Sequence, residues 1–290
     1  MMIKLVVTDM DGTLLSQKCG ISPRNLKAIH MLQSQNIEFA IASGRDYDGV
    51  YSIVHQYGIE CDAILGNGAQ YVDQDGHVLM SSYMNKDILK DVVHVFEEAH
   101  LPYMIFTTKG FYTGCQPHFV KDSFIERAQC RFGSTLEDYQ QGGPFYHSPC
   151  NHLIYIDDFD QFLTRNLQII KVESFSLNAL DMIPVKEKLK DIPTISYLSS
   201  FDDNIEVTNQ TAQKGYILEK VIQQKNYSKE EVVVLGDGMN DYSLFECFPY
   251  SFAPQNAEPI IQKMAYRIVD DCENDGFAEA IDIVLKDLGH

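Results

Sequence analysis

Two aspartates separated by a single residue follow the first apolar run of the chain, in "VVTDMDGTLL" at residues 6–15. Asp9 and Asp11 therefore come at the end of a predicted buried strand. At such a site, partial loss of solvent makes the repulsion between two like charges cost kilocalories. Some other group in the chain is needed to offset that repulsion.

A second set of polar residues follows another apolar run, in "EVVVLGDGMND". Asp237 ends this run, and Asn240 and Asp241 open the helix predicted after it. Because polar groups gather at the carboxyl ends of parallel strands, Asp237 is expected near Asp9 and Asp11. Three carboxylates favour a hard divalent cation, and few protein ligands plus water suit Mg²⁺. Phosphoryl chemistry uses such a site, since the metal neutralises phosphate oxygens and leaves a carboxylate free to attack.

Five further residues stand where they could contact an anion or a carboxylate. Ser43 and Gly44 leave a second predicted strand and open a helix, and helix N-termini bind anions. Arg45, which follows them, is expected to be a structural ion-pair partner rather than a catalytic residue. Asn67, in "GNGA", ends a third strand and is either a turn residue or a substrate contact. Lys214 begins a helix, where its ammonium could hold a nucleophile and a transferring phosphoryl group together.

The elements that carry these residues alternate between strand and helix along the first and last thirds of the chain. Nearly continuous apolar strands joined by helices are typical of a parallel sheet covered on both faces. The predicted strands comprise residues 3–7, 37–43, 63–67 and 231–237. The predicted helices comprise residues 22–35, a segment through Tyr51 and Val54, and residues 212–225, 240–247 and 274–288.

The middle of the chain has a different pattern. An amphipathic helix and strands such as "YMIFTT" and "IIKVESF" do not strictly alternate there, which indicates an α+β unit. We therefore predict an α/β fold, with a Rossmann-like parallel-sheet core (residues 1–82 and 209–290) interrupted by an inserted α+β cap domain (residues 83–208). Candidates in the insert for contact with the non-phosphate part of a substrate are Tyr112, Phe145, Tyr146 and His147.

Composition excludes several classes of partner. The 290 residues include 23 Lys and Arg against 41 Asp and Glu, a formal charge of -18, so nucleic acid and anionic membranes would be repelled. Seven widely spaced cysteines without a Cys-x-x-Cys pair favour a reducing compartment. No apolar run is long enough for a membrane span, and the N-terminal one is too short for a signal peptide. We expect a soluble cytoplasmic protein.

Four motifs, taken in order along the chain, resemble those of the haloacid dehalogenase-like hydrolases. Within that family they are similar to the Cof-type phosphatases with a large α/β cap (type IIB). "DMDGTLL" looks like the first motif, "SGR" the second, Lys214-Gly215 the third and "GDGMND" the fourth. The first and fourth motifs together are highly specific.

The resemblance implies a role for each motif residue. Asp9 would be the nucleophile that forms an aspartyl-phosphate, and Asp11 the general acid and base. Mg²⁺ would bind Asp9, the backbone carbonyl of Asp11 and Asp237, with Asp241 nearby. The implied activity is Mg²⁺-dependent hydrolysis of a small phosphate monoester, such as a sugar phosphate. Three residues would contact the phosphate, namely Ser43, Lys214 and Asn240.

Two alternatives remain open from the sequence. A phosphomutase, which transfers a phosphoryl group within a sugar phosphate, shares all four motifs. A phosphatase differs from it by releasing free phosphate without a bisphosphate activator. A non-catalytic regulator that binds a phosphometabolite is disfavoured, because a pure binder needs neither the nucleophile Asp9 nor the acid Asp11.

Overall fold

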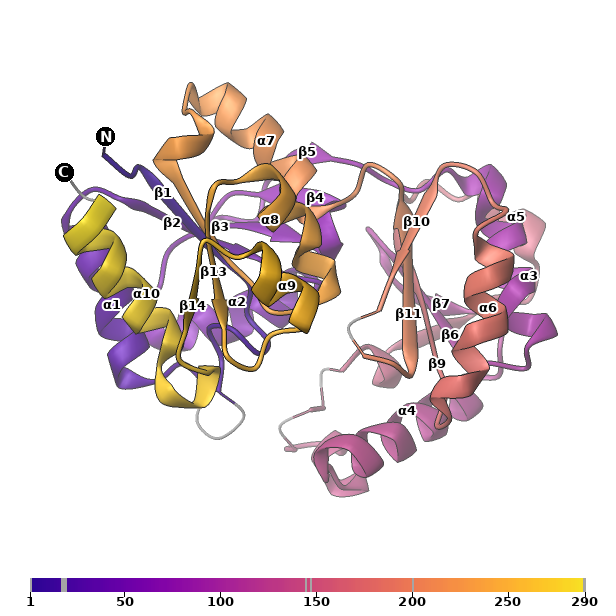
Figure 1. Cartoon of the computed structure of the whole chain (residues 1–290). Coiled ribbons are helices and arrows are strands. Elements are labelled where there is room, and N and C mark those ends of the chain that lie inside the picture. Colours follow the sequence, from indigo (N-terminus) through magenta and orange to yellow (C-terminus); the bar gives the residue numbers. More distant parts are fainter. Residues whose placement is uncertain (1, 17–19, 144, 147, 200, 289–290) are drawn as a thin grey trace. The chain divides into compact units, whose positions relative to one another are not determined.

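The computed structural model describes residues 2–16, 20–143, 145–146, 148–199 and 201–288. The prediction for His147 therefore lies outside the described residues. The chain forms two compact units, which are described separately (Figure 1). The first unit comprises Met1–Ser82 and Thr211–His290, and the second comprises Tyr83–Gln210.

The first unit is built on an eight-stranded sheet with the order β14-β13-β12-β1-β2-β3-β4-β5. The strands from β14 to β3 pair in parallel, so the predicted parallel-sheet core is confirmed. An antiparallel hairpin, β4 and β5, extends one edge and was not predicted. The strands are β1 (Leu5–Thr8), β2 (Glu38–Ala42), β3 (Asp62–Leu65), β4 (Gln70–Val72), β5 (Val78–Ser81), β12 (Val232–Leu235), β13 (Tyr250–Pro254) and β14 (Arg267–Val269).

Helices cover both faces of this sheet (Figure 1). Apolar side chains of α1, α2 and α10 pack with one face of the strands, and those of α7, α8 and α9 pack with the other. Two buried layers explain why β1 and β12 consist almost wholly of apolar residues, every one of them buried. The helices are α1 (Pro23–Ser34), α2 (Tyr47–Val54), α7 (Lys214–Lys225), α8 (Tyr242–Cys247), α9 (Pro259–Met264) and α10 (Gly276–Ile283).

The second helix begins later than the sequence predicted. Ser43 and Gly44 were expected to open it, but α2 begins at Tyr47 with Asp46 as its N-cap. The backbone before it makes other contacts: Ser43 Oγ accepts from the N–H of Arg45, and the carbonyl of Arg45 accepts from the next loop. These bonds hold residues 43–45 as a bent loop at the end of β2. Ser43 and Gly44 therefore lie in the loop before α2 and not at its N-terminus.

The order of the strands places the motifs at one position. From β1 the chain runs outward through β2 and β3 on one side, and it later returns to β12 on the other side of β1. Such a change of direction opens a crevice at the carboxyl ends of the two central strands, where α/β proteins bind ligands. Asp9 follows β1 and Asp237 follows β12 by two residues.

The second unit contains a six-stranded sheet with the order β10-β11-β9-β6-β7-β8. Helices α3, α5 and α6 pack on one face of it, and α4 contributes Phe124 to an aromatic contact with Phe175. Of the predicted substrate contacts, Tyr112 is buried, whereas Phe145 and Tyr146 are exposed. The strands are β6 (Tyr103–Thr107), β7 (Gly110–Thr113), β8 (Leu153–Tyr155), β9 (Ile169–Phe175), β10 (Ile195–Leu198) and β11 (Asn204–Asn209). The helices are α3 (Leu89–Glu98), α4 (Pro117–Phe132), α5 (Phe159–Thr164) and α6 (Met182–Leu189).

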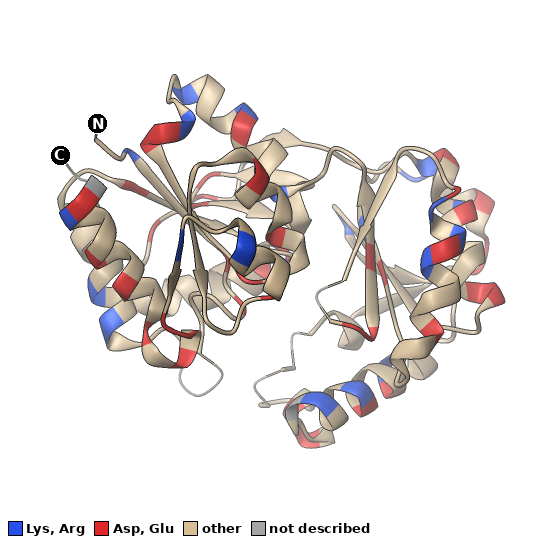
Figure 2. Cartoon of the chain, in the orientation of Figure 1, with Lys and Arg blue, Asp and Glu red and all other residues tan. Residues whose placement is uncertain are grey.

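Acidic residues are spread over the helices and loops of both units (Figure 2). The negative charge of the chain is therefore not confined to one segment. In the part of the chain that the structure describes, no helix combines the length and the apolar character that crossing a bilayer requires.

Candidate active site

Lys214 is the centre of the candidate site. It is the first residue of α7, and its side chain is fully buried. Its Nζ donates to Asp9 Oδ1 and to Asp241 Oδ1, each over 2.6 Å. A solvated surface lysine makes no such contacts. The ammonium instead joins the carboxylate after β1 to the carboxylate after β12.

Close backbone packing fixes the start of α7. A Cβ on Gly215 would lie 2.1 Å from the carbonyl oxygen of Ser243, so only glycine fits at that position. The N–H of Gly215 donates to Ser243 Oγ over 2.9 Å. On the other side, a Cβ on Gly68 would lie 2.5 Å from the backbone of Gln213. These contacts hold the residue between them, Lys214, in place.

Asp241 belongs to the short 3₁₀ turn η8 (Met239–Asp241) and orders the loop after β12. Its Oδ2 accepts from the backbone N–H groups of Asp237 and Gly238, over 3.0 and 3.1 Å. Its other oxygen receives the Lys214 bond. Because both oxygens already have donors, this buried carboxylate positions Lys214 and the Asp237 loop.

Asp237 lies against the loop that follows β1. Thr13 Oγ1 donates to its Oδ1 over 2.8 Å, and a Cβ on Gly12 would lie 2.4 Å from its Oδ2. Gly12 has a φ of +85°, a backbone conformation that glycine adopts without strain. The Asp-Gly-Thr part of the first motif therefore brings Asp237 next to the Asp9 loop.

These carboxylates carry more negative charge than the described residues around them neutralise. Oxygens of Asp9, Asp237 and Asp241 lie within 4.8 Å of one another, and the Lys214 ammonium pairs with two of these carboxylates, Asp9 and Asp241. Burial and the neighbouring aspartates raise the pKa of Asp9 well above its usual value, although Lys214 opposes the shift. Burial, followed by Asp241, raises the pKa of Asp237 to about 7. Burial lowers the pKa of Lys214, but Asp241 and Asp9 outweigh it and raise that pKa, so Lys214 stays charged.

This donor set fits a divalent cation. When all three carboxylates are ionised, they exceed the one ammonium by two negative charges, which a doubly charged ion would balance. All the candidate ligand atoms are carboxylate oxygens, which hard cations such as Mg²⁺ prefer.

Asn67 contacts three other residues that were predicted to bind substrate, namely Ser43, Gly44 and Asn240. Asn67 is fully buried in the turn η2 (Gly66–Gly68), with a left-handed φ of +58°. Its Oδ1 accepts from Asn240 Nδ2 over 3.3 Å and lies so close to Gly44 that a Cβ there would be 2.8 Å away. The N–H of Asn67 donates to the carbonyl of Ser43 over 3.0 Å. Three strand-end loops are thus joined through one asparagine.

Asp11 is the predicted site residue that lies apart. Its two oxygens accept from Arg45, over 2.8 Å from Nε and 2.6 Å from Nη2. Its side chain is 55% exposed, whereas that of Asp9 is 6% exposed. The expectation that Arg45 is an ion-pair partner is therefore confirmed, and its partner is the candidate acid and base.

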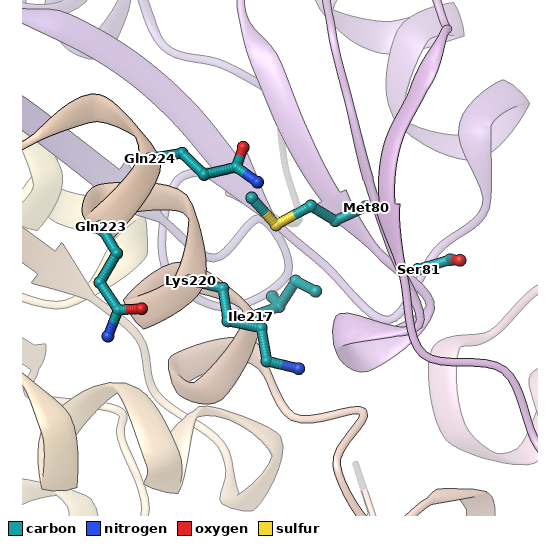
Figure 3. Close-up of a pocket in the computed structure, with 6 residues that line it drawn as sticks. All are labelled: Met80, Ser81, Ile217, Lys220, Gln223 and Gln224. Carbon is teal, nitrogen blue, oxygen red and sulfur yellow. The ribbon is translucent and has the colours of Figure 1, made fainter.

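A pocket elsewhere on the first unit involves none of the predicted site residues. It lies between α7 and the edge strand β5 (Figure 3). Ile217 lines it from α7, and Met80 lines it from β5. Both residues pack with the apolar cluster on that face of the sheet, so the pocket lies over the core rather than at the strand ends.

Three residues around the site were not predicted as contributors to it. Thr13 bonds Asp237, and Asn256 Nδ2 donates to the carbonyl of Gly12 over 2.8 Å. Arg45 was predicted to form an ion pair, but its partner was not. Thr13 and Arg45 belong to the motifs themselves, which was a signal available in the sequence. Asn256 follows a different strand, and only the folded sheet brings it to the first loop.

Comparison with known proteins assigns the family. The sequence model of one family, the haloacid dehalogenase-like hydrolases, matches residues 6–281. Phosphatase YwpJ of Bacillus subtilis is 25% identical over 286 residues, which cover 98% of this chain and 100% of that protein. The 5-amino-6-(5-phospho-D-ribitylamino)uracil phosphatase YbjI of Escherichia coli is 27% identical over 294 residues, covering 99% and 97%.

A solved structure supports the same assignment. It is that of a haloacid dehalogenase-like hydrolase from B. subtilis, which superposes with a TM-score of 0.83 and 25% identity over 97% of this chain and 99% of that one. The predicted resemblance is thereby confirmed over nearly the whole length. The chain is a phosphoric monoester hydrolase that belongs to the haloacid dehalogenase-like hydrolases.

Proposed function

We propose that the chain is a Mg²⁺-dependent phosphatase that hydrolyses a small phosphate monoester through an aspartyl-phosphate on Asp9. The observation that carries this proposal is the buried contact of Lys214 with Asp9 and Asp241, beside Asp237. A reactive carboxylate, a fixed cation and an uncompensated negative charge meet there. Together they suit attack on a phosphoryl group.

The proposed metal ligands are Asp9, the backbone carbonyl of Asp11, and Asp237, with Asp241 at the same cluster. When bound, Mg²⁺ would neutralise the cluster and the phosphate oxygens, so that an anionic carboxylate can approach an anionic ester. Asp241 has donors on both oxygens, which makes it the weakest candidate of the four.

The chemistry then falls to two aspartates. An oxygen of Asp9 forms a bond to phosphorus as the bond from phosphorus to the leaving oxygen breaks, and Asp11 gives that oxygen a proton. A water molecule next attacks phosphorus and passes a proton to Asp11, while the bond to Asp9 breaks. Asp11 is thereby protonated for the next cycle. The products are an alcohol and inorganic phosphate.

The remaining site residues would bind the phosphate. Lys214 contacts Asp9, where negative charge is shared between nucleophile and phosphoryl oxygens. Ser43, Gly44 and Asn240 lie on the loops around Asn67 and offer hydroxyl, backbone and amide donors. We propose that Asn67 acts mainly by holding these loops together.

The proposed substrate is a sugar phosphate or a similar small phosphometabolite. One relative is named for a ribityl phosphate ester, in which the phosphate is attached to a polyol chain. We further propose that the second unit is the cap that selects among such esters. A cytoplasmic location is proposed from the wide spacing of the cysteines.

A screen of phosphorylated metabolites for phosphate release, with Mg²⁺ and with excess chelator, tests the proposal. We expect release from a subset of small monoesters that stops in chelator. Full activity in chelator would contradict the metal dependence. Turnover that needs a bisphosphate activator and leaves the phosphate on the sugar would identify a phosphomutase instead.

A further inference from the structure

Arg45 holds the side chain of Asp11 outside the Asp9 carboxylate cluster. Among the described residues, the carboxylate cluster comprises Asp9, Asp237 and Asp241 and leaves Asp11 out. An acid must come within hydrogen-bond distance of the leaving oxygen, which in an in-line displacement lies on the side of the phosphorus opposite Asp9. Both oxygens of Asp11 are instead bonded to Arg45.

Contacts with nearby residues of the chain fix the Arg45 guanidinium in a position to bind Asp11. Its Nη1 donates to the carbonyl of Gly49, over 3.2 Å, in the first turn of α2. A Cβ on Gly49 would lie 3.2 Å from the Cβ of Arg45, so glycine leaves room for the arginine side chain. The backbone of Arg45 is held at both ends, by Ser43 Oγ and by the N–H of Gly66. The fork of Nε and Nη2 is therefore aimed at Asp11.

Two parallel bonds from a planar guanidinium fix both the place and the rotation of a carboxylate, which a lysine ammonium does not do. An exposed aspartate without such a partner would turn freely about its side-chain bonds. Arg45 is thus placed to decide where the Asp11 oxygens point. Because Asp11 takes part in both proton transfers of the proposed mechanism, its orientation bears on both.

We propose that Arg45 is a positioning residue for Asp11: it holds the carboxylate outside the Asp9 cluster at rest and keeps one of its oxygens while the other turns to the leaving oxygen. This role rests on the proposed phosphatase function. The bound ester drives the turn, because its leaving oxygen offers Asp11 a new partner that the free protein lacks. Arg45 acts as the pivot.

The test compares two substrates in Arg45→Met and Arg45→Lys. An alkyl phosphate such as glycerol phosphate has a basic leaving oxygen and needs protonation, whereas nitrophenyl phosphate needs little. Loss of the pivot should lower kcat/KM for the alkyl ester by about tenfold or more, since misplaced catalytic groups cost up to about a hundredfold. The fall for nitrophenyl phosphate should be several times smaller. Arg45→Lys should recover part of the difference.

Two further variants make the result specific. In an Asp11→Asn background, Arg45→Met should cause no further change in kcat/KM for either ester, because the group that Arg45 positions has lost its function. Arg24→Met is the matched control: Arg24 forms a single exposed contact of 3.3 Å with Asp282, and its loss should leave the ratio of the two substrates unchanged. Thermal unfolding of each variant checks the fold.

The contrary outcomes are distinct. Equal losses on both esters, or a loss that persists in Asp11→Asn, would mean that Arg45 acts on the phosphate or the fold, and the positioning role would be wrong. Wild-type ratios in Arg45→Met would reduce the pair to a structural contact. A wild-type protein that hydrolyses neither ester would refute the phosphatase proposal, and the Arg45 role with it.

Discussion

At the scale of single residues, the site is defined by charge. The buried Lys214 ammonium lies between two carboxylates. Beside them, burial raises the pKa of a third carboxylate, Asp237, to about 7. A buried ion pair adds little stability by itself, but the removal of one partner leaves a buried charge uncompensated. Lys214 and Asp237 should therefore respond to mutation in opposite directions.

Lys214→Met should lower both turnover and stability. The change removes the cation that balances Asp9 and Asp241, and loss of a preorganised charge at a phosphoryl group costs about 10²- to 10³-fold in kcat. Lys225 offers a matched control, because it ends the same helix and pairs with Glu38 over 2.6 Å while 28% exposed. Lys225→Met should retain wild-type kcat in the steady-state assay. A Lys214→Met variant with wild-type kcat/KM would show that the ammonium has no part in catalysis.

Asp237→Asn should stabilise the metal-free protein while it weakens metal binding. The folded-state pKa of Asp237 lies above its usual value of 3.8, so the ionised form is disfavoured by folding and costs stability increasingly as pH rises from about 4 to about 7. A neutral amide removes that cost. Scanning calorimetry in chelator at neutral pH should show a melting temperature a few degrees higher, because about 1 kcal/mol corresponds to about 2–4 °C at this size. A lower melting temperature would contradict the charge excess.

The same pKa gives metal binding a dependence on pH. Asp237 must lose its proton before it can bind a cation, so affinity for Mg²⁺ should fall as pH drops below about 7, with proton release on binding. Titration calorimetry in two buffers of different protonation enthalpy measures the released protons. Asp237→Asn, which has no proton to lose at this position, is the control. An affinity that does not vary between about pH 6 and pH 8 would be contrary to this assignment.

At the scale of elements, the sequence predicted the four central strands of the first unit (β12, β1, β2 and β3) but not the strands at its two edges (β13, β14, β4 and β5). The strands β1, β2 and β12 are nearly unbroken apolar runs because they are buried on both faces, and such runs can be recognised in a sequence. The late start of α2 at Tyr47 was not legible, because it depends on bonds from residues 43–45 to their own loop and to the turn at Gly66. The direction of the Asp11 side chain was not predicted: its carboxylate contacts Arg45, whereas that of Asp9 joins the cluster.

Asn67 joins three strand-end loops, so its replacement tests how those loops are held together. Asn67→Gly should keep the left-handed turn, since glycine adopts a φ of +58° freely, but it removes the oxygen that accepts from Asn240. KM for a phosphate ester should rise by about three- to tenfold, and the melting temperature should fall by a few degrees because a buried hydrogen bond is lost. Asn226→Gly is the matched control, because Asn226 also has a left-handed φ, +56°, but lies exposed at the end of α7. An unchanged KM in Asn67→Gly would mean that the three loops hold their places without the asparagine.

At the scale of the whole molecule, the chain leaves the first unit and returns to it at one place. Ser82 and Thr211 are the last and first residues on either side of the second unit, and their hydroxyl oxygens are 2.6 Å apart. The first unit also has buried apolar clusters on both faces of its sheet. A short glycine-rich linker can therefore replace residues 83–210 without moving the two ends.

That replacement tests the proposed selection by the cap. The shortened protein should bind metal and hydrolyse nitrophenyl phosphate slowly, because the motif residues all lie in the first unit. Its preference among natural phosphate esters should disappear, since the part proposed to contact the rest of the substrate is absent. Circular dichroism and thermal unfolding establish that it folds. Retention of the full-length substrate ranking by the folded variant would place selectivity in the loops of the first unit.

The most direct test of the proposed mechanism is to locate the phosphoryl group that the enzyme carries during turnover. Asp11→Asn should form the aspartyl-phosphate from nitrophenyl phosphate, whose leaving group needs little protonation, and then hydrolyse it slowly for lack of a base. Acid quenching followed by peptide fragmentation in a mass spectrometer should locate the phosphoryl group on Asp9, and Asp9→Asn should give none. A phosphoryl group on another residue, or undiminished phosphate release by Asp9→Asn, would contradict the assignment of Asp9 as nucleophile.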